Sequence, residues 1–292
     1  MSRLLAPLLA VALLSVGSQP ETRRVYVSAH DRNGAIIADL AAADIEVKEG
    51  GKTREIVSLR PADGSLQIAI LVDDNGTGLF RVAVARFIEA LLGRAEFSII
   101  TVAGQPLKLT PFTPNSDVLR EAILKLTARP GTSDGGQLLA GISDAALDFE
   151  RRRVERPVIL ALTVGGEEHT PLPPDHVLEQ LRKSGAALHV VSVIGYQLRS
   201  TTQTNRPEDL LKENLGINQV LGDGPKRSGG RRQEVPAIAG VVTGLQQLAE
   251  ALKRQYVLEY ALPAGVKPSD RFSVSTKRRE VTLLAPTHIP SK

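Results

Sequence analysis

The chain has 292 residues, of which 42% are hydrophobic and 23% are charged, and it contains no cysteine. This composition is typical of a globular protein with one large core and a small accessory unit, and it excludes disulfide stapling, thiol catalysis and a lipidated cysteine. The net charge is +4, but the basic residues are spread out, aromatic residues make up 3% and tryptophan is absent, which argues against a nucleic-acid partner.

The first residues have the pattern of a secretory signal peptide. Arg3 precedes an apolar run over Leu4–Val16, and small residues follow at Gly17 and Ser18. The run is too short to span a bilayer, and the small residues suit cleavage after Ser18. We therefore expect residues 1–18 to be removed, and the mature protein to be periplasmic or secreted with no membrane span.

Residues 19–62 are predicted to form a small N-terminal β unit. Apolar and polar residues alternate over 25–29 and 45–49, which indicates half-buried strands, and Asp31-Arg32-Asn33-Gly34 indicates a turn. The polar stretch 61–64 is interpreted as a linker to the next domain.

Residues 64–254 show apolar strands that alternate with amphipathic helices. This alternation predicts an α/β fold with a doubly wound, mostly parallel sheet flanked by helices. Prolines beside one of the strands, 107–112, place it at an edge. The expected strands are 66–72, 97–102, 107–112, 157–163 and 187–194, and the expected helices are 80–92, 116–126, 137–152, 175–183 and 236–254.

The segment 197–234 interrupts this alternation. It is polar and rich in glycine, with few periodic apolar positions, which predicts a long insertion that is either ordered or disordered. After it, residues 255–292 are predicted to hold three further strands. We expect these strands to pack with the N-terminal unit into one accessory β layer.

The most informative segment is Leu66–Gly78, where an apolar strand runs into Asp73-Asp74-Asn75-Gly76-Thr77-Gly78. In an α/β fold, ligands bind where the central strands end. Oxygen donors at the alternate positions Asp73, Asn75 and Thr77 could turn toward one hard cation such as Mg²⁺. Asp and Asn are also common in a strand-to-helix turn, where they cap the next helix. Spacing alone leaves both interpretations open.

The layout resembles the von Willebrand factor type A domain, in the variant found in exported bacterial proteins, notably those of acidobacteria. The resemblance covers nearly the whole mature chain, and it rests on the order of several individually weak segments. These segments are Val25-Tyr26-Val27 through Ala43 to Gly51, Gly222 to Lys226 with Ser228 to Arg232, and Leu248 to Tyr260. The resemblance implies the type A fold and a role in binding another protein or an envelope component.

The family's metal-ion-dependent adhesion site has Asp-x-Ser-x-Ser after the first strand, a Thr in a later loop and an Asp after the fourth core strand. By resemblance, Asp73, Asn75 and Thr77 correspond to the first motif, and Thr132 to the loop Thr. Val164 stands where the last Asp is expected, which predicts a degenerate site that holds Mg²⁺ or Mn²⁺ weakly or not at all. The residues predicted to contact the partner at the same edge are Asp74, Ser133, Asp134, Glu167 and Glu168.

Sequence motifs for catalysis are absent. The chain has no Gly-x-Ser-x-Gly elbow, no His-Glu-x-x-His pair and no Walker-type Gly-Lys-Ser/Thr. We therefore expect a binding protein and not an enzyme. Two alternatives are a metal-independent scaffold that binds through the basic residues of 197–234, and a hydrolase.

Overall fold

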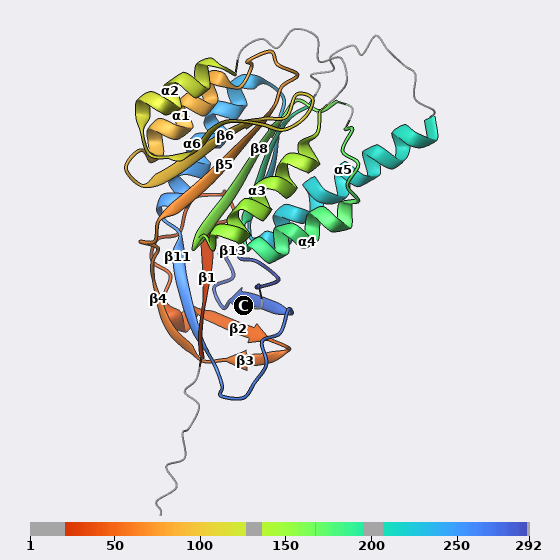
Figure 1. The fold of residues 1–292 in the computed structure, drawn as a ribbon. Coiled ribbons are helices and arrows are strands. Elements are labelled where there is room, and N and C mark those ends of the chain that lie inside the picture. The colour runs from red at the N-terminus through yellow and green to blue at the C-terminus, as the bar shows by residue number, and fades with distance from the viewer. Residues whose placement is uncertain (1–20, 127–135, 167, 195–206, 291–292) are drawn as a thin grey trace, which may run out of the picture.

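The computed structural model describes residues 21–126, 136–166, 168–194 and 207–290, and it describes residues 207–214 by their backbone alone. Its centre is a six-stranded sheet in the order β10-β9-β8-β5-β6-β7, in which every neighbouring pair is parallel except β6 and β7 (Figure 1). The strands are β5 (Leu66–Asp73), β6 (Ala95–Thr101), β7 (Leu107–Thr113), β8 (Arg156–Thr163), β9 (Ala187–Val193) and β10 (Arg232–Val235). The predicted α/β class, and the edge position of the proline-flanked strand, are thus confirmed.

Helices cover both faces of this sheet (Figure 1). Helices α1 (Arg81–Leu91), α2 (Ser116–Leu124) and α6 (Ile238–Lys253) pack on one face, and α3 (Leu138–Arg152), α4 (Pro174–Ser184) and α5 (Pro207–Ser228) pack on the other. Within the described residues, no helix is long and apolar enough to cross a membrane.

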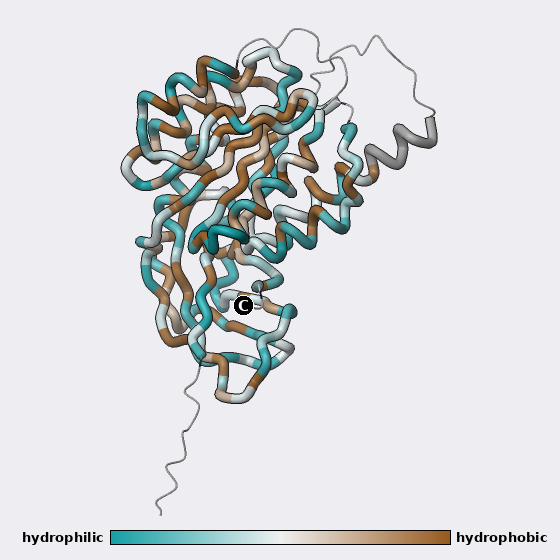
Figure 2. The backbone as a smooth tube through the Cα atoms, viewed as in Figure 1, coloured by the Kyte–Doolittle hydropathy of each residue, from teal (hydrophilic) through white to brown (hydrophobic). Residues whose placement is uncertain are grey.

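Strand β5 shows why the central strands are continuous apolar runs. Its residues Ile68, Ile70 and Val72 pack into the α1/α2/α6 layer, whereas Ala69 and Leu71 pack into the α3/α4/α5 layer. All five side chains are fully buried. A strand buried on both faces has no polar face, so its sequence does not alternate. The hydropathy of the chain follows this arrangement, with apolar residues concentrated in the central strands (Figure 2).

Of the segment predicted as a long insertion, 197–234, residues 197–206 lie outside the described residues, and the described part, 207–234, is mostly regular structure. Residues 207–228 form helix α5, and residues 232–235 form β10, which extends the sheet beside β9. Its glycines are sites of close packing, because a Cβ at Gly224 would lie 2.9 Å from Leu188 Cδ2 and one at Gly230 would lie 1.9 Å from the Leu188 oxygen. The expectation of a long loop here is therefore corrected: the glycines let α5 and the turn after it approach β9.

The two chain ends form a separate β layer below the α/β layer (Figure 1). Strand β1 pairs with β11 in a four-stranded sheet, and β2 pairs with β12 in a three-stranded sheet. At the core of this layer Glu49 is fully buried and ion-paired with Arg23. The strands are β1 (Glu21–His30), β2 (Ile45–Glu49), β3 (Lys52–Arg54), β4 (Ile56–Pro61), β11 (Tyr256–Leu262), β12 (Phe272–Thr276) and β13 (Thr282–Leu284), and a short 3-10 helix spans Ala42–Asp44.

Candidate functional site

The order of the strands places a candidate site between β5 and β8. From β5 the chain passes over one face, through α1, to β6 on one side. It later returns over the opposite face, through α3, to β8 on the other side of β5. Beyond the carboxyl ends of such strands an open α/β sheet leaves a crevice that commonly binds ligands. The last residues of the two strands, Asp73 and Thr163, are aligned in register at this point.

Asp73 lies below the surface of this crevice. Its side chain is buried, and its Oδ2 accepts a hydrogen bond of 2.6 Å from Thr163 Oγ1, which in turn accepts one from the Gly165 N–H. A Cβ at Gly136 would lie 2.8 Å from Asp73 Oδ1, so only glycine lets the segment before α3 come this close. Burial raises the pKa of Asp73 to about 7; the hydrogen bond from Thr163 opposes the rise, and the nearby carboxylates of Glu168 and Asp74 add to it.

Asp74 caps the turn that leads into α1. It is 1% exposed, and its carboxylate accepts hydrogen bonds from the backbone N–H groups of Gly76 (3.1 Å) and Leu79 (2.8 Å). Burial raises its pKa, and these backbone hydrogen bonds oppose the rise. The N-cap residue of α1, Phe80, has no side-chain hydrogen bond of its own to offer. The capping interpretation therefore holds for Asp74. Its side chain is buried, and its contact with a partner stays a prediction.

Asn75 and Thr77 lie nearer the surface than the two aspartates. Asn75 is half-buried and adopts a left-handed backbone conformation, with φ of 52°, which asparagine tolerates better than most residues. Its Nδ2 faces the loop after β8, since a Cβ at Gly166 would lie 3.9 Å from it. Thr77 is exposed, and its hydroxyl donates to the Asp74 carbonyl at 2.8 Å.

Glu168 serves the start of α3. It is 7% exposed, and its two carboxylate oxygens accept hydrogen bonds from the N–H groups of Leu138 (2.9 Å) and Leu139 (3.3 Å). The N-cap residue of this helix, Gln137, makes no side-chain cap of its own. Glu168 therefore satisfies the free N–H groups of the helix from a distant loop. Its side chain is also buried, and its role as a partner contact stays a prediction.

Four of the predicted site residues, Thr132, Ser133, Asp134 and Glu167, lie outside the described residues, and their roles stay predictions. The sequence interpretation also missed two contributors. Thr163 holds the Asp73 carboxylate, and Gly136 makes room for it. The alignment of two strands of equal length, β5 and β8, predicts the contact of Thr163 with Asp73. The contact of Gly136 depends on where the segment before α3 packs, which no local sequence pattern encodes.

The described residues do not fit a divalent cation at this site. Asp74 and Glu168 use both carboxylate oxygens on backbone N–H groups, and Val164, where the family has a carboxylate, is itself buried. Only Asp73 Oδ1 has no hydrogen bond from the described residues, and the described part of the chain contains no cluster of three acidic or histidine side chains suited to a metal. A hard cation needs several anionic oxygens to replace its water, and this arrangement offers one.

No family model matches this chain, and no curated protein matches it. Among solved structures it is similar to a von Willebrand factor type A protein from Catenulispora acidiphila, with 11% identity over 96% of this chain and 76% of that one and a TM-score of 0.44. It is also similar to BatB from Bacteroides thetaiotaomicron, with 13% identity over 65% of this chain and 99% of that one and a TM-score of 0.42.

A third similar structure is proximal thread matrix protein 1 from the mussel byssus, in a form with a zinc-occupied metal-ion-dependent adhesion site. The identity is 12%, the TM-score is 0.46, and the match covers 66% of this chain and 48% of that one. The matched region thus spans about half the length of the byssus protein. The sheet order and the helices on both faces, described above, agree with the α/β fold that the sequence predicts.

Proposed function

We propose that this protein is an exported, non-catalytic binding protein, and that it binds another protein or an envelope component at the carboxyl edge of its parallel sheet. The observation that carries this proposal is the position of Asp73 and Thr163, whose aligned side chains mark the switch point between β5 and β8. In open α/β sheets this is the place where ligands bind.

The groups that would meet the partner are the ones left at the surface of this edge. Asn75 presents a half-buried amide, Thr77 is exposed, and Gly165 and Gly166 form the facing loop with positive φ. Two residues without side chains let a partner approach the backbone closely, where the Gly165 N–H already donates to Thr163 Oγ1. These neutral donors and acceptors suit hydrogen bonding to a polypeptide or glycan surface.

The proposed binding does not depend on a cation. The acids of this edge are turned inward, where they cap helices or bond to Thr163, and so they do not form a divalent site with the other described residues. Saturable binding of Mg²⁺ or Mn²⁺ in a calorimetric titration of the mature protein, abolished in Asp73→Ala, would contradict this part of the proposal. Thr132 would then be the first candidate for the missing ligand.

The alternative site, the basic residues of 197–234, receives less support. Arg227 is ion-paired with Asp223 at 3.6 Å, and Arg232 with Glu234 at 2.8 Å. Their charge is thus partly compensated by acids on their own elements. We therefore place the partner at the carboxyl edge and not on this segment.

The export half of the proposal rests on the signal-peptide pattern of residues 1–18. N-terminal sequencing of the protein secreted by its source cells tests it, and a mature chain that begins near residue 19 is the expected result. The non-catalytic half rests on the absence of the motifs named above, and turnover of generic ester or glycoside substrates would contradict it.

A site-directed crosslinking experiment tests the binding edge. A photoreactive residue at exposed Thr77 is compared with one at exposed Arg86 on α1, using the envelope fraction of the source cells, with Mg²⁺ and with EDTA. We expect one crosslinked species from position 77 alone, in both conditions, and less of it in Asn75→Gly, which keeps the left-handed backbone but lacks the amide. Equal crosslinking from both positions would contradict the proposed edge.

A further inference from the structure

The opposite edge of the parallel sheet, where the strands begin, contains a cavity of about 480 Å³. Its walls come from the linker before β5, the end of α1, the starts of β6 and β8, and the end of α6. Surface cavities of this size hold small molecules in many proteins. It lies at the amino ends of the strands, far along the sheet from Asp73, and it has no role in the function proposed above.

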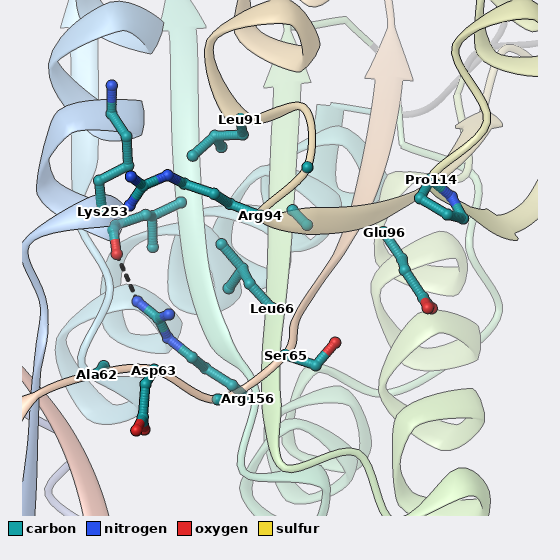
Figure 3. Close-up of a pocket in the computed structure, with 14 residues that line it drawn as sticks. Ala62, Asp63, Ser65, Leu66, Leu91, Arg94, Glu96, Pro114, Arg156 and Lys253 are labelled. Atoms are coloured by element: carbon teal, nitrogen blue, oxygen red, sulfur yellow. Dashed lines mark hydrogen bonds between the residues drawn. The ribbon is translucent and has the colours of Figure 1, made fainter.

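The most unusual residue of this cavity is Arg156, a buried cation without an acidic partner. It is 6% exposed, and within the described residues no carboxylate forms an ion pair with it. Its Nε and Nη2 donate to Gln255 Oε1 at 3.0 and 2.9 Å, and Nη2 also donates to the Leu252 carbonyl. Its Nη1 donates to none of the described residues, while Arg156 lines the cavity (Figure 3).

Neighbouring groups compensate only part of this charge. The guanidinium lies 5.4 Å from the centre of the Tyr26 ring, and Leu252 belongs to the last turn of α6, whose end carries roughly half a negative charge. A buried charge without full compensation is costly. A positive charge therefore remains to be neutralised on the side of the cavity.

Arg94 brings a second guanidinium to the same wall. It is exposed and makes no ion pair with any described residue, and Figure 3 shows its side chain extending over the wall toward Lys253 and Arg156. Lys253 itself is paired with Glu250. Among the described residues that line the cavity, Arg94 and Arg156 are thus the two cations without a carboxylate partner. A planar guanidinium matches the geometry of carboxylate and phosphate.

The acids of the cavity do not neutralise these two arginines. Asp63 lines the cavity, but it is ion-paired at 2.6 Å with Arg60, which does not line it. Glu96 accepts a hydrogen bond of 2.8 Å from Gln67 Nε2, and in Figure 3 it lies on the opposite side of the cavity from the two guanidiniums. Its charge disfavours an anion and limits the affinity of the site without filling it.

We propose that this cavity binds the oxyanion group of a small molecule, a carboxylate or a phosphate, between the guanidiniums of Arg94 and Arg156. Because one wall is the linker 62–65 and Arg156 stacks on Tyr26 of β1, the bound ligand contacts the junction of the α/β and β layers. The ligand would then hold the two layers together.

The test is a calorimetric titration of the mature protein with inorganic phosphate and, separately, with acetate, at constant ionic strength. We expect saturable binding of at least one of them at one site per chain, weakened about tenfold in Arg94→Gln and strengthened in Glu96→Gln, which removes the opposing charge. Arg86→Gln, an exposed arginine of α1 outside the cavity, is the matched control and should bind as the original protein does.

Each outcome decides between the possibilities. Binding of one probe alone assigns the chemical class of the ligand, and binding of both assigns the shared oxyanion chemistry. Absence of saturable binding, or equal losses in Arg94→Gln and Arg86→Gln, would overturn the proposal, since the second result means a general effect of surface charge. Arg156→Lys keeps a positive charge but lacks the planar guanidinium. If this variant is folded by circular dichroism and binds the oxyanion more weakly, the guanidinium recognises the ligand and does not act only by stabilising the fold.

Discussion

The two edges of the parallel sheet bury opposite charges and satisfy them differently. At the carboxyl edge, Asp74 and Glu168 receive backbone N–H groups and Asp73 receives the Thr163 hydroxyl. At the amino edge, Arg156 is equally buried, but one of its nitrogens is left without a partner among the described residues and the side chain lines an open cavity. Buried charge alone therefore does not mark a ligand site; at the amino edge the evidence is a guanidinium nitrogen without a described partner on a side chain that lines an open cavity.

The largest effect that bears on this comparison is the pH dependence contributed by Asp73. Its pKa in the folded state is about 7 against 3.8 when unfolded, so it stabilises the protein fully below pH 3.8 and that stabilisation is lost as pH rises through 7. The loss amounts to about 4 kcal/mol. Urea unfolding between pH 4 and pH 8 should show this slope in His189→Leu, which removes the opposing contribution of His189 described below. Adding Asp73→Asn, whose amide oxygen can still accept from Thr163, should abolish the slope.

The control for this measurement is Asp117→Asn, also combined with His189→Leu, which alters an exposed carboxylate on α2 and should keep the slope. If His189→Leu lost stability with rising pH equally with and without Asp73→Asn, the slope would not come from Asp73, whose carboxylate would then be solvated or neutralised by a cation. Either result would remove the contrast between the two edges.

A second, slightly smaller effect has the opposite sign and comes from His189, in the middle of β9. This side chain is buried and its Nε2 has no partner among the described residues. Burial lowers its pKa to about 4, and the neighbouring charges of Arg231 and His30 lower it further. The folded protein therefore loses about 3 kcal/mol as pH falls from 6.5 to 4, because only the unfolded chain takes up the proton freely.

His189→Leu should abolish this loss, as measured by urea unfolding at pH 4.5 and pH 7. In the original protein the His189 and Asp73 contributions act over nearly the same pH range and largely cancel. We thus expect a flat profile for the original protein, falling stability with rising pH for His189→Leu, and rising stability for Asp73→Asn. A flat profile in both variants would contradict the burial of the two groups.

The third effect separates a capping acid from a binding residue within one turn. Asp74→Ala leaves two backbone N–H groups, those of Gly76 and Leu79, without their acceptor and should cost about 2 kcal/mol of unfolding free energy. Asp74→Asn retains an acceptor and should cost less, and Asn75→Gly should change stability by about 0.5 kcal/mol or less. Thermal unfolding measures all three, and a large loss in Asn75→Gly would assign Asn75 to the fold instead of the surface.

The sequence predicts the α/β core well because its signals are local. The apolar runs that become β5, β8 and β9 and the periodic helices between them need no knowledge of their neighbours. Helix α5 is different. Its Gly216 and Gly224 weaken any local helix signal. However, a Cβ at Gly216 would lie 3.0 Å from Pro174, and a Cβ at Gly224 would lie 2.9 Å from Leu188. Tertiary packing selects these glycines, so the same residues that resemble a loop are the ones the helix contact requires.

The candidate site shows the same division. The position of Asp73 at the end of a central strand follows from the sequence. The direction in which each carboxylate points does not, because Asp74 and Glu168 are oriented by helix starts that form only in the folded protein. Arg156 carried no sequence signal at all, since its burial depends on α6 and β1 meeting over β8.

The smallest expected effect tests the amino edge in the same unfolding assay. At a phosphate or acetate concentration tenfold above its dissociation constant, the bound oxyanion should add about 1.4 kcal/mol to the unfolding free energy, because only the folded protein binds it. With tenfold weaker binding, Arg94→Gln should gain about 0.4 kcal/mol under the same conditions. Asp73→Asn should gain as much as the original protein, since its substitution lies at the other edge of the sheet. Chloride at equal ionic strength is the control, and an equal gain from chloride would mean that screening of the basic surface, and not a site at Arg94 and Arg156, stabilises the fold.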